Sequence, residues 1–349
     1  MKPLVSILIP AYNAELTIAE TLESAVAQTW PRKEIIVVND GSTDGTAKVA
    51  QRFASRGVKV VTTENGGLSA AVNQAYRHSQ GDYIQELDAD DLLLPDKIER
   101  QLAALQECGS KRVLASSPWA SFYFSRREAR FVRNSLWQDL SPVEWLLKKM
   151  GENLHMQNAT WLMSREVAEA AGPWNEQLKY DQDGEYYTRV LLASDGTRFV
   201  PGTGILYRAG QGNRISYIGN SEKKKDSLLV SMKLHMQYLR SLEESDRVRK
   251  ACVRYMQAWY SVFYPERTDI MAELQAIATE LQGQLYPPRL SLKYAWMAPI
   301  IGYRATKRIR HKMSPIRNFF TSKYHQLMFK AEIRRGLNSA STQFSAGDL

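Results

Sequence analysis

The chain has 349 residues, of which 44% are hydrophobic, and a formal net charge of +9. It is long enough to bury a full core, so we expect one large domain with an appendage. Its two cysteines, Cys108 and Cys252, fit no disulfide framework or metal-binding spacing, and no stretch approaches the ~20 apolar residues of a membrane helix. The apolar run at the N-terminus is too short for a signal peptide, so we expect a cytoplasmic protein.

The first 90 residues alternate between short apolar runs and amphipathic stretches. The runs predict strands at 5–10, 34–38, 58–61 and 82–87, and the stretches between them predict helices at 15–29, 46–55 and 68–79. This alternation is typical of an α/β domain with a mostly parallel sheet. Ligands of such sheets bind beyond the carboxyl ends of the strands. Asp40, the pair Gly66-Gly67 and an acidic cluster all fall there.

The acidic cluster follows the apolar pair Tyr83-Ile84 and contains Asp88, Asp90 and Asp91. Side chains alternate along an extended chain, so Asp88 and Asp90 point the same way. Neighbouring carboxylates repel one another and favour a hard cation such as Mg²⁺ or Mn²⁺, which shares its ligands with substrate phosphates. The alternative is a solvated turn that opens a helix at Leu92, with Asp91 as its N-cap.

Four segments in this order resemble the family 2 glycosyltransferases. They are Pro10-Ala11-Tyr12-Asn13, 38–46, Asn65-Gly66-Gly67, and Asp88-Ala89-Asp90-Asp91 with Pro95. The resemblance covers roughly residues 3–216. It implies a GT-A fold, in which a Rossmann-like, mostly parallel sheet is flanked by helices, and a nucleotide-sugar donor. A dinucleotide-binding oxidoreductase is disfavoured, because no Gly-x-Gly-x-x-Gly follows the first strand.

The resemblance assigns roles to the residues of these segments. Asp40 would accept the imide N–H of a uracil or thymine ring. Asp88 would contact the ribose or the metal shell, and Asp90 would bind the Mn²⁺ or Mg²⁺ that bridges the two phosphates. The remaining nucleotide-binding candidates are Pro10, Ala11, Tyr12, Asn13, Gly66 and Gly67. Tyr12 would either stack on the base or fill the edge of the core.

Residues 155–165 are predicted to form a strand that, in related enzymes, lies beside the acceptor site. Trp161 there is a candidate for stacking on an acceptor sugar, although a large aromatic residue in an apolar strand more often belongs to the core. His155 is expected to be a hydrogen-bonded structural group.

Residues 180–189 resemble the family's Glu-Asp-x-Glu-x-x-x-Arg pattern, with the neutral Gln182 in place of its first acid. Asp183 is therefore the candidate general base, which must take the proton of the acceptor hydroxyl. Its alternative role is that of a helix N-cap. Further along, Arg208 and Arg214 flank a glycine-containing loop and are candidates for contacting the diphosphate.

The last fifth of the chain is strongly basic. Residues 281–349 contain twelve Lys and Arg against two acids, and 304–317 contain six basic residues and no acid. An apolar, aromatic run at 294–303 precedes the latter, a combination typical of a segment that lies on an anionic membrane. A solvated tail is the alternative, and nucleic-acid binding is disfavoured because nothing else in the chain suggests such a module.

These observations divide the chain into a catalytic GT-A domain (1–220), a helical extension (221–286) and a basic segment (287–349) that we expect to touch the inner face of the cell membrane. They predict an inverting glycosyltransferase that moves a sugar from a UDP-sugar or similar donor to a saccharide or a lipid-linked saccharide, in the synthesis of a surface polysaccharide, lipopolysaccharide or capsule. The helical extension would pack on the catalytic domain or on a second copy of the chain. The alternative is an inactive nucleotide-sugar-binding or scaffold protein.

Overall fold

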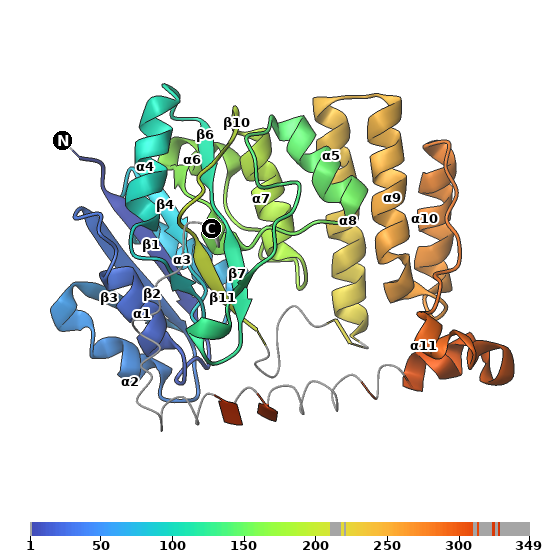
Figure 1. The fold of residues 1–349 in the computed structure, drawn as a ribbon, viewed down its shortest axis with the longest axis horizontal. Coiled ribbons are helices and arrows are strands. Elements are labelled where there is room, and N and C mark those ends of the chain that lie inside the picture. The colour runs from blue at the N-terminus through green and yellow to red at the C-terminus, as the bar shows by residue number, and fades with distance from the viewer. Residues whose placement is uncertain are drawn as a thin grey trace.

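The computed structural model describes residues 2–209, 218–219, 221–309, 313, 323–324 and 327–328. Its largest sheet has the strand order β3-β2-β1-β4-β9 (Figure 1). The first four of these strands are parallel and β9 is antiparallel to β4. Their bounds are β1 Val5–Ala11, β2 Lys33–Asp40, β3 Val58–Thr63, β4 Tyr83–Glu86 and β9 Met163–Ser164.

Two smaller sheets complete the described strands. One has the order β5-β11-β7-β8 and the other pairs β10 with β6. Their bounds are β5 Leu92–Leu93, β6 Val113–Ser116, β7 Trp119–Phe122, β8 Arg130–Phe131, β10 Gly196–Phe199 and β11 Ile205–Arg208.

Helices cover both faces of the main sheet because side chains alternate along β1. Ile7 and Ile9 belong to one buried cluster with residues of α1, whereas Leu8 belongs to another with residues of α3. The helices in the first part of the chain are α1 Ile18–Val26, α2 Thr46–Gln51, α3 Leu68–Arg77, α4 Lys97–Glu107, α5 Pro142–Glu152, α6 Arg165–Ala171 and α7 Gln182–Leu192.

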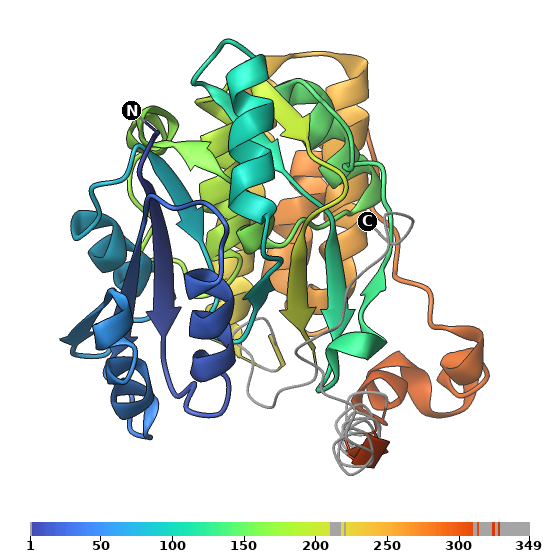
Figure 2. The ribbon, with the colours of Figure 1, turned by 60° about the vertical axis from the view of Figure 1, so that its left-hand side comes forward.

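The C-terminal helices stand side by side on the far side of the molecule from α1 and α2 (Figures 1 and 2). They are α8 Glu222–Leu242, α9 Asp246–Phe263 and α10 Thr268–Glu280, and the short α11 Leu292–Ala295 lies below this row in Figure 1. The buried cluster that contains Leu8 continues through α7 and extends to Phe263 and Leu274. One hydrophobic core therefore joins the main sheet to these helices. In the described part of the chain, no helix is both long and apolar enough to span a bilayer.

Two local predictions were wrong. The alternative for the acidic cluster, a turn that opens a helix at Leu92, is wrong because Leu92 and Leu93 pair with β11 as a short antiparallel strand, and the next helix begins at Lys97. The strand expected over 155–165 is limited to Met163–Ser164, preceded by a turn of 3₁₀ helix at Asn158–Thr160. In the first case pairing with a distant segment outweighs the local pattern. In the second, the side chain of Gln157 accepts the backbone N–H of Ala159 and stabilises the 3₁₀ turn in place of an extended chain.

Candidate functional site

The polar segments at the strand ends meet at one edge of the main sheet. Ala11 ends β1 and Asp40 ends β2, and Asp88 follows β4 by two residues. These strands are parallel, so their carboxyl ends share this edge. A cavity of about 1120 Å³ opens there.

The cavity brings together most of the residues predicted from the sequence. Those that line it are Pro10, Ala11, Tyr12, Asn13, Asp40, Gly67, Asp88, Asp90 and Asp183. Tyr12 is 52% exposed, so its ring is accessible to a ligand rather than part of the core. Trp161 is 2% exposed and also touches the cavity, from within the core. Gly66 and Arg208 are not among the lining residues, and Arg214 lies outside the described residues.

Asp40 is held in place by the glycine pair. Its two carboxylate oxygens accept the backbone N–H groups of Gly66 and Gly67 at 2.8 and 2.9 Å. Gly67 has a φ of +89°, a conformation that side chains with a Cβ rarely adopt. Each carboxylate oxygen has two lone pairs, so each keeps one acceptor position after binding a glycine N–H.

Asp88 and Asp90 differ from Asp91 in what surrounds them. Asp88 and Asp90 line the cavity, whereas Asp91 is fully buried. Gln157 donates to Asp91 Oδ2 at 2.6 Å and to Asp88 Oδ2 at 3.2 Å, and the backbone N–H of Arg208 donates to Asp91 Oδ1 at 2.8 Å. Burial, reinforced by Asp90 and Asp88, raises the pKa of Asp91 well above its ordinary value. Asp91 therefore supports the cluster and caps no helix.

The donor set of Asp88 and Asp90 fits a hard cation. No group of three or more His, Cys, Asp or Glu in the described chain could hold a metal by itself. Mg²⁺-type ions, however, are commonly bound by one or two carboxylates together with substrate phosphates and water. Two cavity-lining carboxylates meet that requirement.

Arg208 lies beneath the acidic cluster and is 4% exposed. Its Nε donates to the carbonyl of Asp90 at 2.9 Å, its Nη2 contacts Glu20, and its guanidinium lies 4.5 Å from the ring centroid of Phe122. These contacts orient the loop that carries Asp90.

Asp183 lies in the first turn of α7 and faces the cavity. Its carboxylate accepts no hydrogen bond from the described residues, which leaves it accessible to an incoming hydroxyl. The N-cap position belongs to Asp181, which has a φ of +59°. Glu185 and Arg189 form an ion pair across successive turns of the helix, with Arg189 Nε 2.7 Å from Glu185 Oε1.

Sequence reasoning missed Asp181 and the residues that hold it. Its Oδ2 accepts the hydroxyl of Ser231 at 2.6 Å and lies 3.8 Å from Nε2 of His235, both on α8. Nδ1 of His235 in turn lies 2.8 Å from the hydroxyl of Tyr255 on α9. Burial raises the pKa of Asp181 and lowers that of His235. No local pattern links residues 50 or more positions apart, so the sequence carried no signal for this network.

Other lining residues also escaped prediction. Lys149 of α5 and Trp259 of α9 face the cavity from the side of Asp183. His155 lines it too, edge-on to Trp119 at 6.1 Å between ring centroids. His155 was expected to be a hydrogen-bonded structural residue, but its ring makes no hydrogen bond to a described residue.

Glu86 is a buried carboxyl group just behind the acidic cluster and is 5% exposed. Its Oε1 accepts Nε1–H of Trp174 at 3.0 Å and its Oε2 accepts the hydroxyl of Tyr187 at 2.9 Å. Burial raises the pKa of Glu86 to about 8, although the two hydrogen bonds oppose the shift. Glu86 is therefore protonated at neutral pH and ties β4 to α7.

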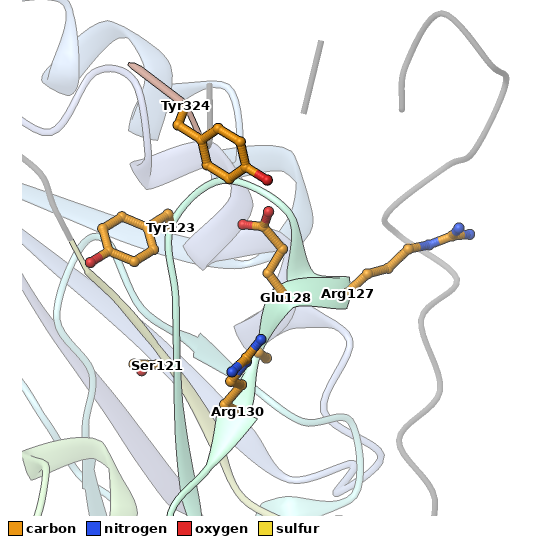
Figure 3. Close-up of a pocket in the computed structure, with 7 residues that line it drawn as sticks. Ser121, Tyr123, Arg127, Glu128, Arg130 and Tyr324 are labelled. Atoms are coloured by element: carbon orange, nitrogen blue, oxygen red, sulfur yellow. The ribbon is translucent and has the colours of Figure 1, made fainter. Parts of the chain in front are cut away.

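A second hollow, of about 620 Å³, lies at the edge formed by β7 and β8. Figure 3 shows Tyr123, Glu128 and Tyr324 grouped around it. None of the residues predicted to bind a ligand lines this hollow, so it is separate from the site at the strand ends.

The chain is similar in sequence and in fold to known glycosyltransferases. Residues 6–171 match the family Glycosyl transferase family 2. An uncharacterized glycosyltransferase of Rickettsia typhi is 33% identical over 199 residues, which cover 55% of this chain and 60% of the relative. The chain thus spans less than two thirds of that relative's length.

Two solved structures share the fold. The crystal structure of S. aureus TarS 1-349 in complex with UDP-GlcNAc superposes with a TM-score of 0.58 at 16% identity, covering 83% of this chain and 95% of TarS. The mannosyltransferase PcManGT from Pyrobaculum calidifontis, in complex with GDP-Man and Mn²⁺, gives 0.51 at 20% identity, covering 95% of this chain and 87% of the other. The chain has a GT-A-like α/β fold, as predicted.

Proposed function

Because residues 6–171 match the family Glycosyl transferase family 2, we propose that this chain is an inverting glycosyltransferase that uses a nucleotide-diphosphate sugar, namely a UDP-sugar. The observation that supports the proposal is the single cavity lined by Asp40, by the pair Asp88 and Asp90, and by Asp183. A base, a diphosphate with its cation, and an acceptor hydroxyl each need one of these partners.

In this proposal the donor lies along the strand ends. Asp40 accepts the imide N–H of the base with its remaining acceptor positions, and the backbone of Pro10, Ala11 and Asn13 flanks the ring, on which Tyr12 stacks. Asp88 and Asp90 would hold Mn²⁺ or Mg²⁺, and the ion would supply positive charge to stabilise the departing diphosphate. The use of Mn²⁺ by a protein with the same fold is consistent with this assignment.

Transfer then proceeds as one displacement. Asp183 takes the proton of the acceptor hydroxyl, the hydroxyl oxygen forms a bond to the anomeric carbon, and the bond from that carbon to the diphosphate oxygen breaks on the opposite face. The products are the glycosylated acceptor and a nucleoside diphosphate. We place residues 1–220 in this chemistry and assign the acceptor to a surface polysaccharide, lipopolysaccharide or capsule. Arg208 contacts Asp90 and does not line the cavity, so we assign it no contact with the diphosphate.

The test is hydrolysis of UDP-, dTDP- and GDP-sugars by the purified protein with Mn²⁺. We expect slow release of one nucleoside diphosphate, abolished by a chelator and by Asp90→Ala. Glu107→Ala, which removes a carboxylate whose side chain is 73% exposed on α4, is the control and should retain the activity. Nucleotide binding without turnover of any donor, even with membrane extract as acceptor, would favour an inactive binding or scaffold protein instead.

We further propose that the segment after Pro288 contacts an anionic membrane. Residues 298–309 are helical, and Trp296, Ile300 and Ile301 are 64%, 73% and 42% exposed. Lys307 is anchored to Glu266 at 2.7 Å, so this segment is joined to the turn between α9 and α10. Sedimentation with phosphatidylglycerol vesicles should be stronger than with phosphatidylcholine vesicles and should weaken in Trp296→Ala. Equal sedimentation with both lipids would contradict the proposal.

A further inference from the structure

The part of the cavity beyond Asp183 is built by helices that the donor does not need. Tyr255 and Trp259 reach it from α9, which lies outside the family match, and Trp145 and Lys149 reach it from successive turns of α5. Asp181 and Asp183 approach it from α7. The proposed acceptor hydroxyl must enter on this side, because Asp183 faces it.

The ammonium group of Lys149 has no hydrogen-bond or ion-pair partner in the described structure. It is the sole lysine or arginine among the described residues that line the cavity. Within the described structure its Nζ makes no hydrogen bond and no ion pair. Burial lowers the pKa of Lys149, and the charges of Asp181 and Asp183 oppose that shift. A half-buried charge that lacks a hydrogen-bond acceptor is destabilising, and a bound ligand can supply the acceptor.

The two nearest carboxylates have other tasks. Asp181 already accepts the hydroxyl of Ser231 at 2.6 Å, and its pKa is raised by burial. Asp183 is the proposed base and must stay accessible to the hydroxyl. Lys149 therefore needs another hydrogen-bond acceptor, which an anionic group of the ligand would supply.

Aromatic rings line the same part of the cavity, which we call the acceptor compartment. Tyr180 and Trp259 form an edge-to-face pair, with ring centroids 6.3 Å apart and an interplanar angle of 76°, and both line the cavity with Tyr255. A pocket walled by aromatic rings with one fixed polar group is suited to a ligand that has an apolar face and a placed charge. A sugar ring with an acidic substituent has both features.

We propose that this compartment binds an acceptor saccharide that carries an anionic group, a carboxylate or a phosphate, next to the hydroxyl to be glycosylated, and that Lys149 binds that group. The inference rests on the proposed function, because it assumes that Asp183 marks the acceptor side. Lys149 is then a residue that determines acceptor specificity, and the helical extension supplies the rings against which the acceptor packs.

The test uses three methyl glycosides that share one ring. Methyl β-D-glucoside is neutral, methyl β-D-glucuronide carries a carboxylate at C6, and methyl β-D-glucoside 6-phosphate carries a phosphate there. Binding of each to the full-length protein, with UDP and Mn²⁺ present, is measured by ligand-observed NMR titration. Lys149→Met removes the charge and keeps much of the volume. Lys148→Met is the matched control, since Lys148 lies on the same helix but does not line the cavity.

We expect one anionic glycoside to bind the wild-type protein roughly tenfold more tightly than the neutral one, as for one charge-assisted hydrogen bond. Lys149→Met should lose this preference and Lys148→Met should keep it. Whether the carboxylate or the phosphate is preferred identifies the acidic group. Equal binding of all three glycosides, binding of none, or a preference that survives in Lys149→Met would overturn the inference.

Two further measurements separate this inference from the proposed function. UDP affinity and donor hydrolysis are measured first on the wild-type protein. Their absence would refute the proposed function itself, whereas their presence without an anionic preference would refute the acceptor assignment alone. A loss of UDP affinity in Lys149→Met would assign Lys149 to the donor diphosphate and would also refute it.

Discussion

Replacing Asp40 with asparagine tests the best-defined contact of the site. The two oxygens of Asp40 each accept one glycine N–H, at 2.8 Å from Gly66 and 2.9 Å from Gly67. Asparagine has one carbonyl oxygen, so it can keep one of these bonds while its NH₂ group faces the other N–H. A hydrogen bond to a charged group contributes about 1.5–3 kcal/mol, so we expect the free energy of unfolding to fall by about 2–3 kcal/mol.

The same substitution should weaken nucleotide binding. The asparagine NH₂ group would also face the imide N–H of the base, so the loss of one charged acceptor predicts a decrease in UDP affinity of about 10–100-fold. Urea unfolding measures the first effect and isothermal titration with UDP the second. Asp226→Asn is the control, since its side chain is 59% exposed and pairs with Arg267 at the surface, where such pairs contribute about 0–1 kcal/mol.

The two readings of Asp40 give different results. A loss of stability with unchanged UDP affinity would make Asp40 a structural residue of the glycine turn and refute its role in base binding. Unchanged stability would refute the argument from the two glycine contacts.

Three further predictions follow from the site. Asp183→Asn should lower the transfer rate by about 10²–10⁴-fold, the usual contribution of a general base, while UDP still binds. Glu86→Gln should change how stability depends on pH. The pKa of Glu86 is about 8 in the folded protein and 4.5 is its ordinary value, so the folded state keeps a proton that the unfolded chain releases, and wild-type stability should fall as pH rises from 4.5 to 8. The glutamine variant should lack that part of the fall. Ser231→Ala should remove the 2.6 Å bond to Asp181, reduce stability by about 1 kcal/mol and slow transfer, because Asp181 directly precedes the helix that carries Asp183 and this bond holds it in place.

Each of these has a result that contradicts it. Full transfer activity in Asp183→Asn would remove Asp183 from the chemistry. Parallel stability profiles of wild type and Glu86→Gln, measured by urea unfolding across that pH range, would show that Glu86 is ionised in the folded protein. Transfer that is unaffected by Ser231→Ala, beside a measurable loss of stability, would confine Ser231 to a structural role.

The residues of the main sheet and its strand ends were accessible from sequence because each depends on a local pattern. The apolar runs that form β1 and β2 have the period and length of buried strands, and Asp40 and Asp88 directly follow such runs. The parallel order then places these ends together without further information. Asp183 was chosen from the resemblance of residues 180–189 to a family pattern, and the structure places it in the first turn of α7 at the cavity.

The remaining residues depend on contacts between distant parts of the chain. The strand at Leu92 was not predicted, because its partner Leu206 in β11 lies more than 100 residues away in the sequence. Lys149 and Trp259 are ordinary members of amphipathic helices until the packing of α5 on α9 brings both to the cavity. Asp181 resembles a turn residue, and its network with Ser231, His235 and Tyr255 appears only when α8 and α9 are in place.

The link between Asp181 and α8 has a consequence for protein engineering. An attempt to change the acceptor by exchanging the C-terminal helices for those of another protein would also exchange Ser231 and His235, and with them the groups that fix the start of α7. A graft that matched only the surface shape of these helices would therefore displace Asp183, the proposed base. A functional chimera must therefore keep a hydroxyl group at position 231 and an imidazole at position 235.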